Sequence, residues 1–168
     1  EDSYIKLQKE CNKVIIIGFS MGGLIAVNLL LKHKAYALVL INTPVYFWDF
    51  KMMAVSVIDD IKRGHIKNVR RYFGACTDKP LLTLINFLIL LNKTKRLFNK
   101  IYCPVFIGQG MKDDTVQFRS ADYIYDKIPA EKQLKFYENS GHRIFQGEEK
   151  GQALSDIKEF IKNQNGKV

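Results

Sequence analysis

The sequence predicts an α/β protein with a mostly parallel sheet flanked by helices. Two short runs, Val14–Ile17 and Ala37–Ile41, contain only apolar residues, which is typical of strands that a parallel sheet buries on both faces. A third run, Pro104–Gly108, repeats the pattern later in the chain, and segments with helical periodicity separate the runs. A chain of 168 residues is long enough for one domain with a sizeable core.

The elements before residue 45 follow in a clear order. Asp2–Lys9 mixes apolar and charged side chains, as the end of an amphipathic helix does. The strand Val14–Ile17 comes next, followed by a helix from Met21 to about Lys32 and the strand Ala37–Ile41. The turn residues Asn42-Thr43-Pro44 end that strand.

The character of the sequence changes between residues 45 and 100. No short apolar run there is bounded by turn residues, and the patterns are helical: Met52–Arg63, His65–Phe73 and Leu81–Leu91. We therefore expect a helical insertion at 45–100 within a core made of residues 1–44 and 101–168. Because Leu81–Leu91 is apolar on all sides, it suits either a helix buried against the core or an acyl-chain pocket or interfacial lid.

The remaining elements return to the α/β pattern. The strand Pro104–Gly108 is followed by a helix over Arg119–Ile128 and an alternating strand over Leu134–Glu138. Glu148–Lys162 is predicted to close the chain as an amphipathic helix. Its apolar face is expected to contain Leu154, Ile157, Phe160 and Ile161.

A Gly-x-Ser-x-Gly motif, Gly18 to Gly22, lies between the first strand and the following helix. A serine at the apex of such a strand–turn–helix is held in a strained conformation that exposes its Oγ, the arrangement called a nucleophile elbow. We expect Gly18 and Gly22 to be required because a Cβ atom at either position would collide where the strand and helix approach each other.

A serine nucleophile needs a base and an acid that orients the base. His142 lies in a loop after the last predicted strand, whereas the other two histidines lie at a helix end and in the insertion. Asp113 and Asp114 follow the strand Pro104–Gly108. Because functional groups gather at the carboxyl ends of parallel strands, we expect Ser20, His142 and one of the two aspartates to meet there.

These motifs resemble the α/β-hydrolase superfamily, and within it small bacterial carboxylesterases and monoacylglycerol lipases with a short helical cap. The resemblance rests on three segments in order, each at a strand end: Gly18–Gly23, Pro104–Val116 and Ser140–His142. It covers nearly the whole chain, and it implies that this chain is the C-terminal portion of such a fold.

The resemblance implies an esterase mechanism. Ser20 would be the nucleophile, His142 the base and Asp113, rather than Asp114, the acid. The backbone N–H of Met21 would meet the oxyanion, and no metal or organic cofactor is expected. The expected function is hydrolysis of a small uncharged ester. The alternatives are a thioesterase, a serine peptidase, or a catalytically incomplete fragment that acts as a scaffold.

The start of the chain departs from the family pattern. The resemblance implies several strands before the elbow strand, together with a His-Gly type loop that supplies a second oxyanion donor, and neither occurs before Ser20. Losing one such donor costs about 100- to 1000-fold in turnover. We expect Val14–Ile17 to form an open sheet edge that pairs with another copy or with a separate N-terminal segment.

Aromatic residues near the strand ends are candidates for the substrate pocket: Phe19, Tyr46, Phe47 and Trp48. Core packing is the more frequent role of such residues. Of the four, Phe19 and Tyr46 are the two that we expect to contact substrate.

The charge and the cysteine content limit which partners and which cellular location we expect. The formal net charge is +9, but the sequence contains no nucleic-acid recognition module and no ladder of aromatic residues interleaved with the basic ones. A solvated basic face is therefore favoured over nucleic-acid binding. Any membrane contact is expected to be peripheral. The three cysteines lack metal-ligand spacing and are odd in number. They favour reduced thiols and a cytoplasmic location.

Overall fold

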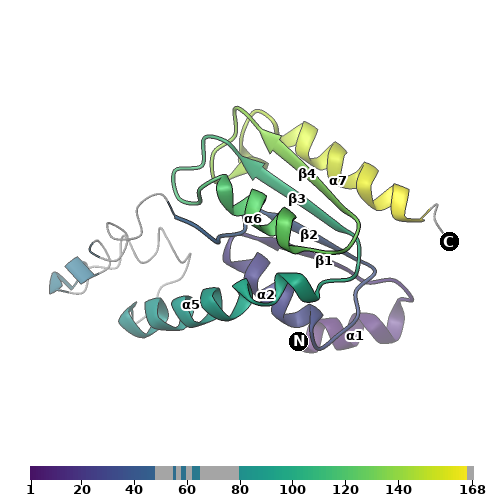
Figure 1. Ribbon diagram of the computed structural model, residues 1–168, viewed down its shortest axis with the longest axis horizontal. Coiled ribbons are helices and arrows are strands. Elements are labelled where there is room, and N and C mark those ends of the chain that lie inside the picture. The colour runs from purple at the N-terminus through teal and green to yellow at the C-terminus, as the bar shows by residue number, and fades with distance from the viewer. Residues whose placement is uncertain (48–54, 56–57, 60–61, 65–79, 166–168) are drawn as a thin grey trace.

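The computed structural model describes residues 1–47, 55, 58–59, 62–64 and 80–165. This part of the chain contains a four-stranded parallel sheet in the order β1-β2-β3-β4 (Figure 1). The strands are β1 (Ile15–Phe19), β2 (Ala37–Ile41), β3 (Val105–Gly110) and β4 (Lys132–Tyr137). The predicted α/β class with a parallel sheet is confirmed, and each predicted strand is present with its ends shifted by at most two residues.

The helices lie between and beside the strands. They are α1 (Asp2–Glu10), α2 (Met21–Leu30), α5 (Pro80–Lys95), α6 (Arg119–Lys127) and α7 (Lys150–Asn165), with 3-10 turns at Phe98–Lys100 and Ile144–Gln146. Within the predicted insertion, α5 contains Leu81–Leu91. The predicted helix His65–Phe73 lies outside the described residues, and Met52–Arg63 is described only in part.

Alternate residues of β2 point to opposite faces of the sheet. Leu38 and Leu40 pack with residues of α2 and α6, whereas Val39 and Ile41 pack with residues of α7. Figure 1 shows α6 and α7 on the two sides of the sheet. Helices on both faces explain why every residue of β2 is apolar and buried.

Strand β1 forms one edge of the sheet. It pairs with β2 on one side only within the described residues. Ile17 is 57% exposed and Phe19 is 40% exposed. Their register partners Val39 and Ile41 belong to the core cluster that contains α7, so this apolar surface lies on the α7 side of the sheet.

Helix α5 packs one face against α2 and leaves the other face exposed. Leu84, Phe87 and Leu91 form a buried cluster with Leu24 of α2. The opposite face carries exposed apolar residues: Leu82, Ile85 and Ile89. The apolar character on all sides of this helix therefore reflects one packed face and one exposed face in the part of the chain that the structure describes.

Helix α7 covers the second face of the sheet. Ile157 and Phe160 are buried and Ile161 is partly buried against the same cluster, as predicted. Leu154 is 39% exposed, so its assignment to the buried face was wrong. Ala153 takes that place because the stripe at 153, 157 and 160 follows the helical period.

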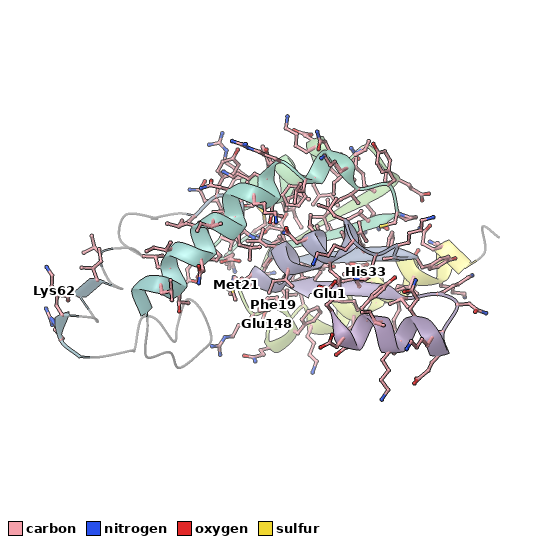
Figure 2. All side chains as sticks on the ribbon, turned by 90° about the horizontal axis from the view of Figure 1, so that it is seen from below. Glu1, Phe19, Met21, His33, Lys62 and Glu148 are labelled. Carbon is pink, nitrogen blue, oxygen red and sulfur yellow. The ribbon has the colours of Figure 1, made fainter. Side chains whose placement is uncertain are left out.

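Helix α1 is attached to the end of α2. The Glu1 carboxylate lies 3.0 Å from Lys32 Nζ and 3.2 Å from His33 Nε2, and Figure 2 shows Glu1 beside His33. Hydrogen bonds from these two side chains lower the pKa of Glu1. The Tyr4 hydroxyl donates to the carbonyl oxygen of Lys34. These contacts hold the N-terminal helix against the body of the protein.

Two further predictions concern membranes and thiols. Among the described residues, no helix combines the length and apolarity that crossing a membrane requires. Cys11 and Cys103 carry free thiols, and Cys76 lies outside the described residues. Burial raises the pKa of the Cys103 thiol to about 11, and the partly buried side chain packs against the core cluster that contains residues of α6.

Candidate active site

Ser20 lies at the sharp turn between β1 and α2. Its backbone has φ 52° and ψ −127°, a conformation that L-residues rarely adopt. Its N–H donates to the carbonyl oxygen of Ile41 at 2.8 Å, which ties the turn to the end of β2. Figure 2 shows Phe19 and Met21, the residues on either side of Ser20. The strained elbow predicted from the sequence is therefore present.

Glycines allow the tight approach of strand and helix at this elbow. A Cβ atom on Gly18 would lie 2.5 Å from Gly23 Cα. The expectation for Gly22 was wrong, because a Cβ there would meet no atom within 4 Å. The second tight position is Gly23, whose Cβ would lie 2.0 Å from Thr43 Oγ1. Gly23 thus packs against the segment after β2, while Gly22 faces open space.

The structure brings Ser20, His142 and Asp113 together in one line of hydrogen bonds. His142 Nε2 lies 3.0 Å from Ser20 Oγ, and His142 Nδ1 lies 2.8 Å from Asp113 Oδ2. Because an ionised carboxylate can only accept, the neutral imidazole carries its proton on Nδ1 and accepts the serine hydroxyl at Nε2. The three side chains come from loops after β1, β3 and β4.

Asp113 and Asp114 have different environments. Asp113 is 3% exposed, and its Oδ1 accepts the backbone N–H groups of Thr115 and Val116 at 2.8 Å each. Asp114 is exposed, and its carboxylate accepts the Thr115 hydroxyl at 3.1 Å. Only Asp113 is directed at His142, which distinguishes between the two aspartates that strand-end reasoning left open.

The loop that carries His142 is fixed on the end of β3. The Ser140 hydroxyl and the Asn139 N–H both donate to Glu149 Oε2, at 2.7 and 2.9 Å. A Cβ on Gly110 would lie 2.5 Å from the Ser140 carbonyl oxygen, so this glycine permits the close approach of the loop. His142 is therefore held by the backbone before it as well as by Asp113.

The predicted aromatic contacts fall in different places. The Phe19 ring lies 5.2 Å from the His142 ring, so Phe19 is next to the serine–histidine pair and partly exposed. Tyr46 lies elsewhere: its ring packs edge-on against Tyr123, in a surface cavity of about 490 Å³. The cavity is lined by Tyr46, Gln117, Arg119, Asp122, Tyr123 and Asp126. Tyr46 is thus not brought to Ser20.

The next aromatic candidate, Phe47, is not brought to the serine either. Phe47 packs against Phe87 of α5, with ring centres 5.6 Å apart, and Trp48 lies outside the described residues. Met21 is the first residue of α2. The first N–H groups of a helix lack intrahelical acceptors, so its N–H is available beside Ser20. The described residues contain no group of three side chains placed to hold a metal ion.

Sequence reasoning missed Asn42, which it treated only as the end of a strand. Asn42 is completely buried, has φ 45° and donates from Nδ2 to the carbonyl oxygen of His142 at 2.6 Å. A signal was available, because asparagine is one of the few residues besides glycine that adopts positive φ. The partner of its side chain, a hundred residues later in the chain, was not visible from the sequence.

Comparison with known proteins identifies a family and relatives of this chain. The family model of the prolyl oligopeptidase family matches residues 6–168. A carboxylesterase of Bacillus subtilis (strain 168) is 25% identical over 173 residues, covering 95% of this chain and 68% of the relative. A thermostable monoacylglycerol lipase of Bacillus sp. (strain H-257) is 27% identical over 157 residues, covering 84% of this chain and 60% of the relative.

Solved structures share the fold. A structure of the metagenome-derived lipolytic enzymes LipS and LipT has a TM-score of 0.76 at 18% identity and covers 96% of this chain and 70% of its own. An esterase from Exiguobacterium antarcticum has a TM-score of 0.66 at 21% identity, covering 93% and 69%. An α/β hydrolase from a lagoon-sediment metagenome has a TM-score of 0.65 at 19% identity, covering 98% and 67%.

The sheet, its flanking helices and these neighbours define an α/β-hydrolase fold. The chain belongs to the prolyl oligopeptidase family. It spans 60% of the length of the monoacylglycerol lipase and 68% of the carboxylesterase that it matches.

Proposed function

We propose that this protein is a serine hydrolase that cleaves carboxylic esters through an acyl-enzyme on Ser20. The observation that carries the proposal is the line from Ser20 Oγ through the His142 ring to the buried Asp113 carboxylate. Two relatives in sequence, a carboxylesterase and a monoacylglycerol lipase, also support ester hydrolysis.

The first half of the reaction follows from the direction of these hydrogen bonds. Ser20 Oγ attacks the ester carbonyl carbon as its proton passes to His142 Nε2, and the carbonyl π electrons move onto the oxygen. Asp113 keeps the proton on Nδ1 and stabilises the imidazolium. The tetrahedral intermediate collapses, the bond to the leaving alkoxide breaks, and His142 returns its proton to that oxygen.

The second half repeats these steps with water. His142 Nε2 takes a proton from water as the water oxygen attacks the acyl carbon, and collapse returns the proton to Ser20. The oxyanion is stabilised in both halves by the Met21 N–H at the start of α2, where the helix dipole also favours negative charge. The exposed face of Phe19 gives the substrate an apolar surface beside the histidine.

Peptide-bond hydrolysis is a second candidate, favoured by the match to the prolyl oligopeptidase family. The same three residues would act on an amide, with an amine as the leaving group. Turnover of p-nitrophenyl acetate and p-nitroacetanilide, which share their acyl group, separates the two candidates. We expect the ester to be cleaved and the anilide to be left intact.

The proposal is tested by turnover of p-nitrophenyl butyrate by the protein and two serine variants. Ser20→Ala is expected to abolish turnover, because it removes the attacking oxygen. Ser155→Ala is the matched control, since Ser155 is exposed on α7. Equal turnover by the protein and its Ser20→Ala variant would contradict the proposal. A folded protein without turnover would support the catalytically incomplete fragment instead.

A further inference from the structure

The buried side chain of Asn42 connects the ends of β2 and β3 with the loop after β4 that carries His142. It follows β2, and its Oδ1 accepts the N–H of Gly110, at the end of β3, at 2.9 Å. Its Nδ2 donates to the His142 carbonyl oxygen at 2.6 Å and lies 3.4 Å from that of Gly141. One amide therefore holds the loop of His142 against the end of β3.

The chemistry of the partners fixes the orientation of this amide. Gly110 offers an N–H, which only Oδ1 can accept, and His142 and Gly141 offer carbonyl oxygens, to which only Nδ2 can donate. Asn42 is completely buried, so breaking these bonds would leave buried polar groups unpaired, which is unfavourable. The side chain consequently has one stable arrangement.

The backbone of Asn42 is strained in the same place. Its φ of 45° lies in the left-handed region, and its N–H donates to the Gly108 carbonyl oxygen at 2.9 Å. Strained residues of this kind persist where surrounding contacts determine the conformation, and they gather at functional sites. The left-handed turn and the three amide contacts act together in directing the side chain toward the His142 loop.

Other contacts hold the earlier part of that loop. Glu149 accepts from Asn139 and Ser140, and the Lys112 N–H donates to the Ser140 carbonyl oxygen at 3.0 Å. Asn42 contacts the backbone of His142 itself. Because Asp113 fixes only the Nδ1 side of the ring, the backbone contact determines how far Nε2 reaches toward Ser20.

We propose that Asn42 is a positioning residue, which holds the His142 backbone so that Nε2 meets Ser20 Oγ. The proposal rests on the proposed function of Ser20 and His142. Misplacement of a reacting group by about 1 Å costs on the order of 100-fold in rate. A positioning role of Asn42 therefore predicts a loss of turnover rate, whereas a role in stability alone predicts only a lower Tm.

The test compares three variants by ester turnover and thermal unfolding. Asn42→Gly tolerates the positive φ but removes the amide. Asn42→Asp keeps the acceptor for Gly110 and replaces the donor by an oxygen that faces the His142 carbonyl. The matched control is Asn28→Ala, which removes another amide that bridges two elements, from α2 to Thr94 of α5 at 2.6 Å.

We expect both Asn42 variants to lower kcat about 100-fold at unchanged KM, measured well below Tm. Asn28→Ala is expected to lower Tm and leave kcat unchanged. A purely structural role of Asn42 would give the pattern of the control, a lower Tm with unchanged kcat, and would overturn the inference.

A second readout does not depend on activity. In protein with ¹⁵N-labelled histidine, the His142 ring is expected to show a single Nδ1–H tautomer. Because Asp113 holds the proton on Nδ1 in both proteins, Asn42→Gly is expected to keep this tautomer and to shift the Nε2 resonance toward that of a nitrogen without a hydrogen bond from Ser20. An unchanged Nε2 resonance would overturn the inference. If the unmodified protein does not turn over ester, the proposed function fails, while this spectrum still decides the role of Asn42.

Discussion

Asp113 accepts a hydrogen bond from His142 Nδ1 at 2.8 Å through Oδ2, while Oδ1 accepts two backbone N–H groups of its own loop. Both carboxylate oxygens are therefore engaged, and the carboxylate cannot rotate away from the histidine without breaking bonds in a buried site. This arrangement fixes the ring orientation and the tautomer that a serine–histidine pair requires.

The two adjacent aspartates are expected to respond differently to substitution. Asp113→Asn replaces an acceptor with a group that can donate to Nδ1, which favours the wrong tautomer of His142. We expect kcat for p-nitrophenyl butyrate to fall about 10⁴-fold. Asp114→Asn is the matched control, because Asp114 is exposed and bonds to Thr115. Near-normal turnover by Asp113→Asn would refute the assignment of the acid.

The glycines of the elbow give a stability prediction. Gly18→Ala places a methyl group 2.5 Å from Gly23 Cα and is expected to lower the free energy of unfolding by about 1–3 kcal/mol. Gly22→Ala meets no atom within 4 Å and lies inside α2, so it is expected to raise that free energy by about 0.5–1 kcal/mol. Urea unfolding of both variants measures the contrast. Equal destabilisation by the two variants would contradict the close approach of strand and helix at Gly18.

The buried Tyr137 hydroxyl is expected to make the free energy of unfolding depend on pH at high pH. This hydroxyl donates to Asp156 Oδ2 at 3.1 Å, and burial, followed by the Asp156 charge, raises its pKa well above the usual value for tyrosine. Because the pKa is raised in the folded state, the contribution to stability is complete below the unfolded pKa of about 10. It is lost as the pH rises further toward the folded pKa.

The corresponding measurement is urea unfolding from about two pH units below to about one unit above the usual tyrosine pKa of about 10. The free energy of unfolding is expected to fall more steeply with pH above 10 in the unmodified protein than in Tyr137→Phe. Parallel curves for the two proteins would mean that Tyr137 does not couple to folding in this range.

The open edge of β1 predicts self-association or the addition of a strand. Ile17 and Phe19 are partly exposed along an edge that pairs only with β2 within the described residues. Such edges favour pairing with another chain. We expect sedimentation velocity to show concentration-dependent association, and Ile17→Lys to reduce it by placing a charge on the apolar edge. A stable monomer at all concentrations would exclude association between copies.

Much of the fold followed from local patterns. The apolar runs at 37–41 and 104–108 became β2 and β3 because a parallel sheet covered on both faces buries every residue of its inner strands. The run at 14–17 became the edge strand β1, which is only partly buried. Ser20, His142 and one of the two aspartates, Asp113 or Asp114, were predicted to meet because each follows a strand, and parallel strands end at the same edge. The hydrogen bonds between them agree with that rule.

The unpredicted features depend on contacts between distant parts of the chain. Gly23, not Gly22, is crowded because Thr43 packs against it, and the motif spacing does not contain that neighbour. Tyr46 turns toward Tyr123 of α6 instead of toward Ser20. The bond from Asn42 to His142 spans a hundred positions, so no local pattern could indicate it.

Mass spectrometry after reaction with a fluorophosphonate, which phosphonylates an activated serine with loss of fluoride, tests most directly whether Ser20 is the nucleophile. We predict one adduct per chain, located in the peptide that contains Ser20 and absent from Ser20→Ala. Labelling of the Ser155→Ala control is expected to match that of the unmodified protein. An adduct on another residue, or no adduct on the folded protein, would contradict the assignment of Ser20 as the nucleophile.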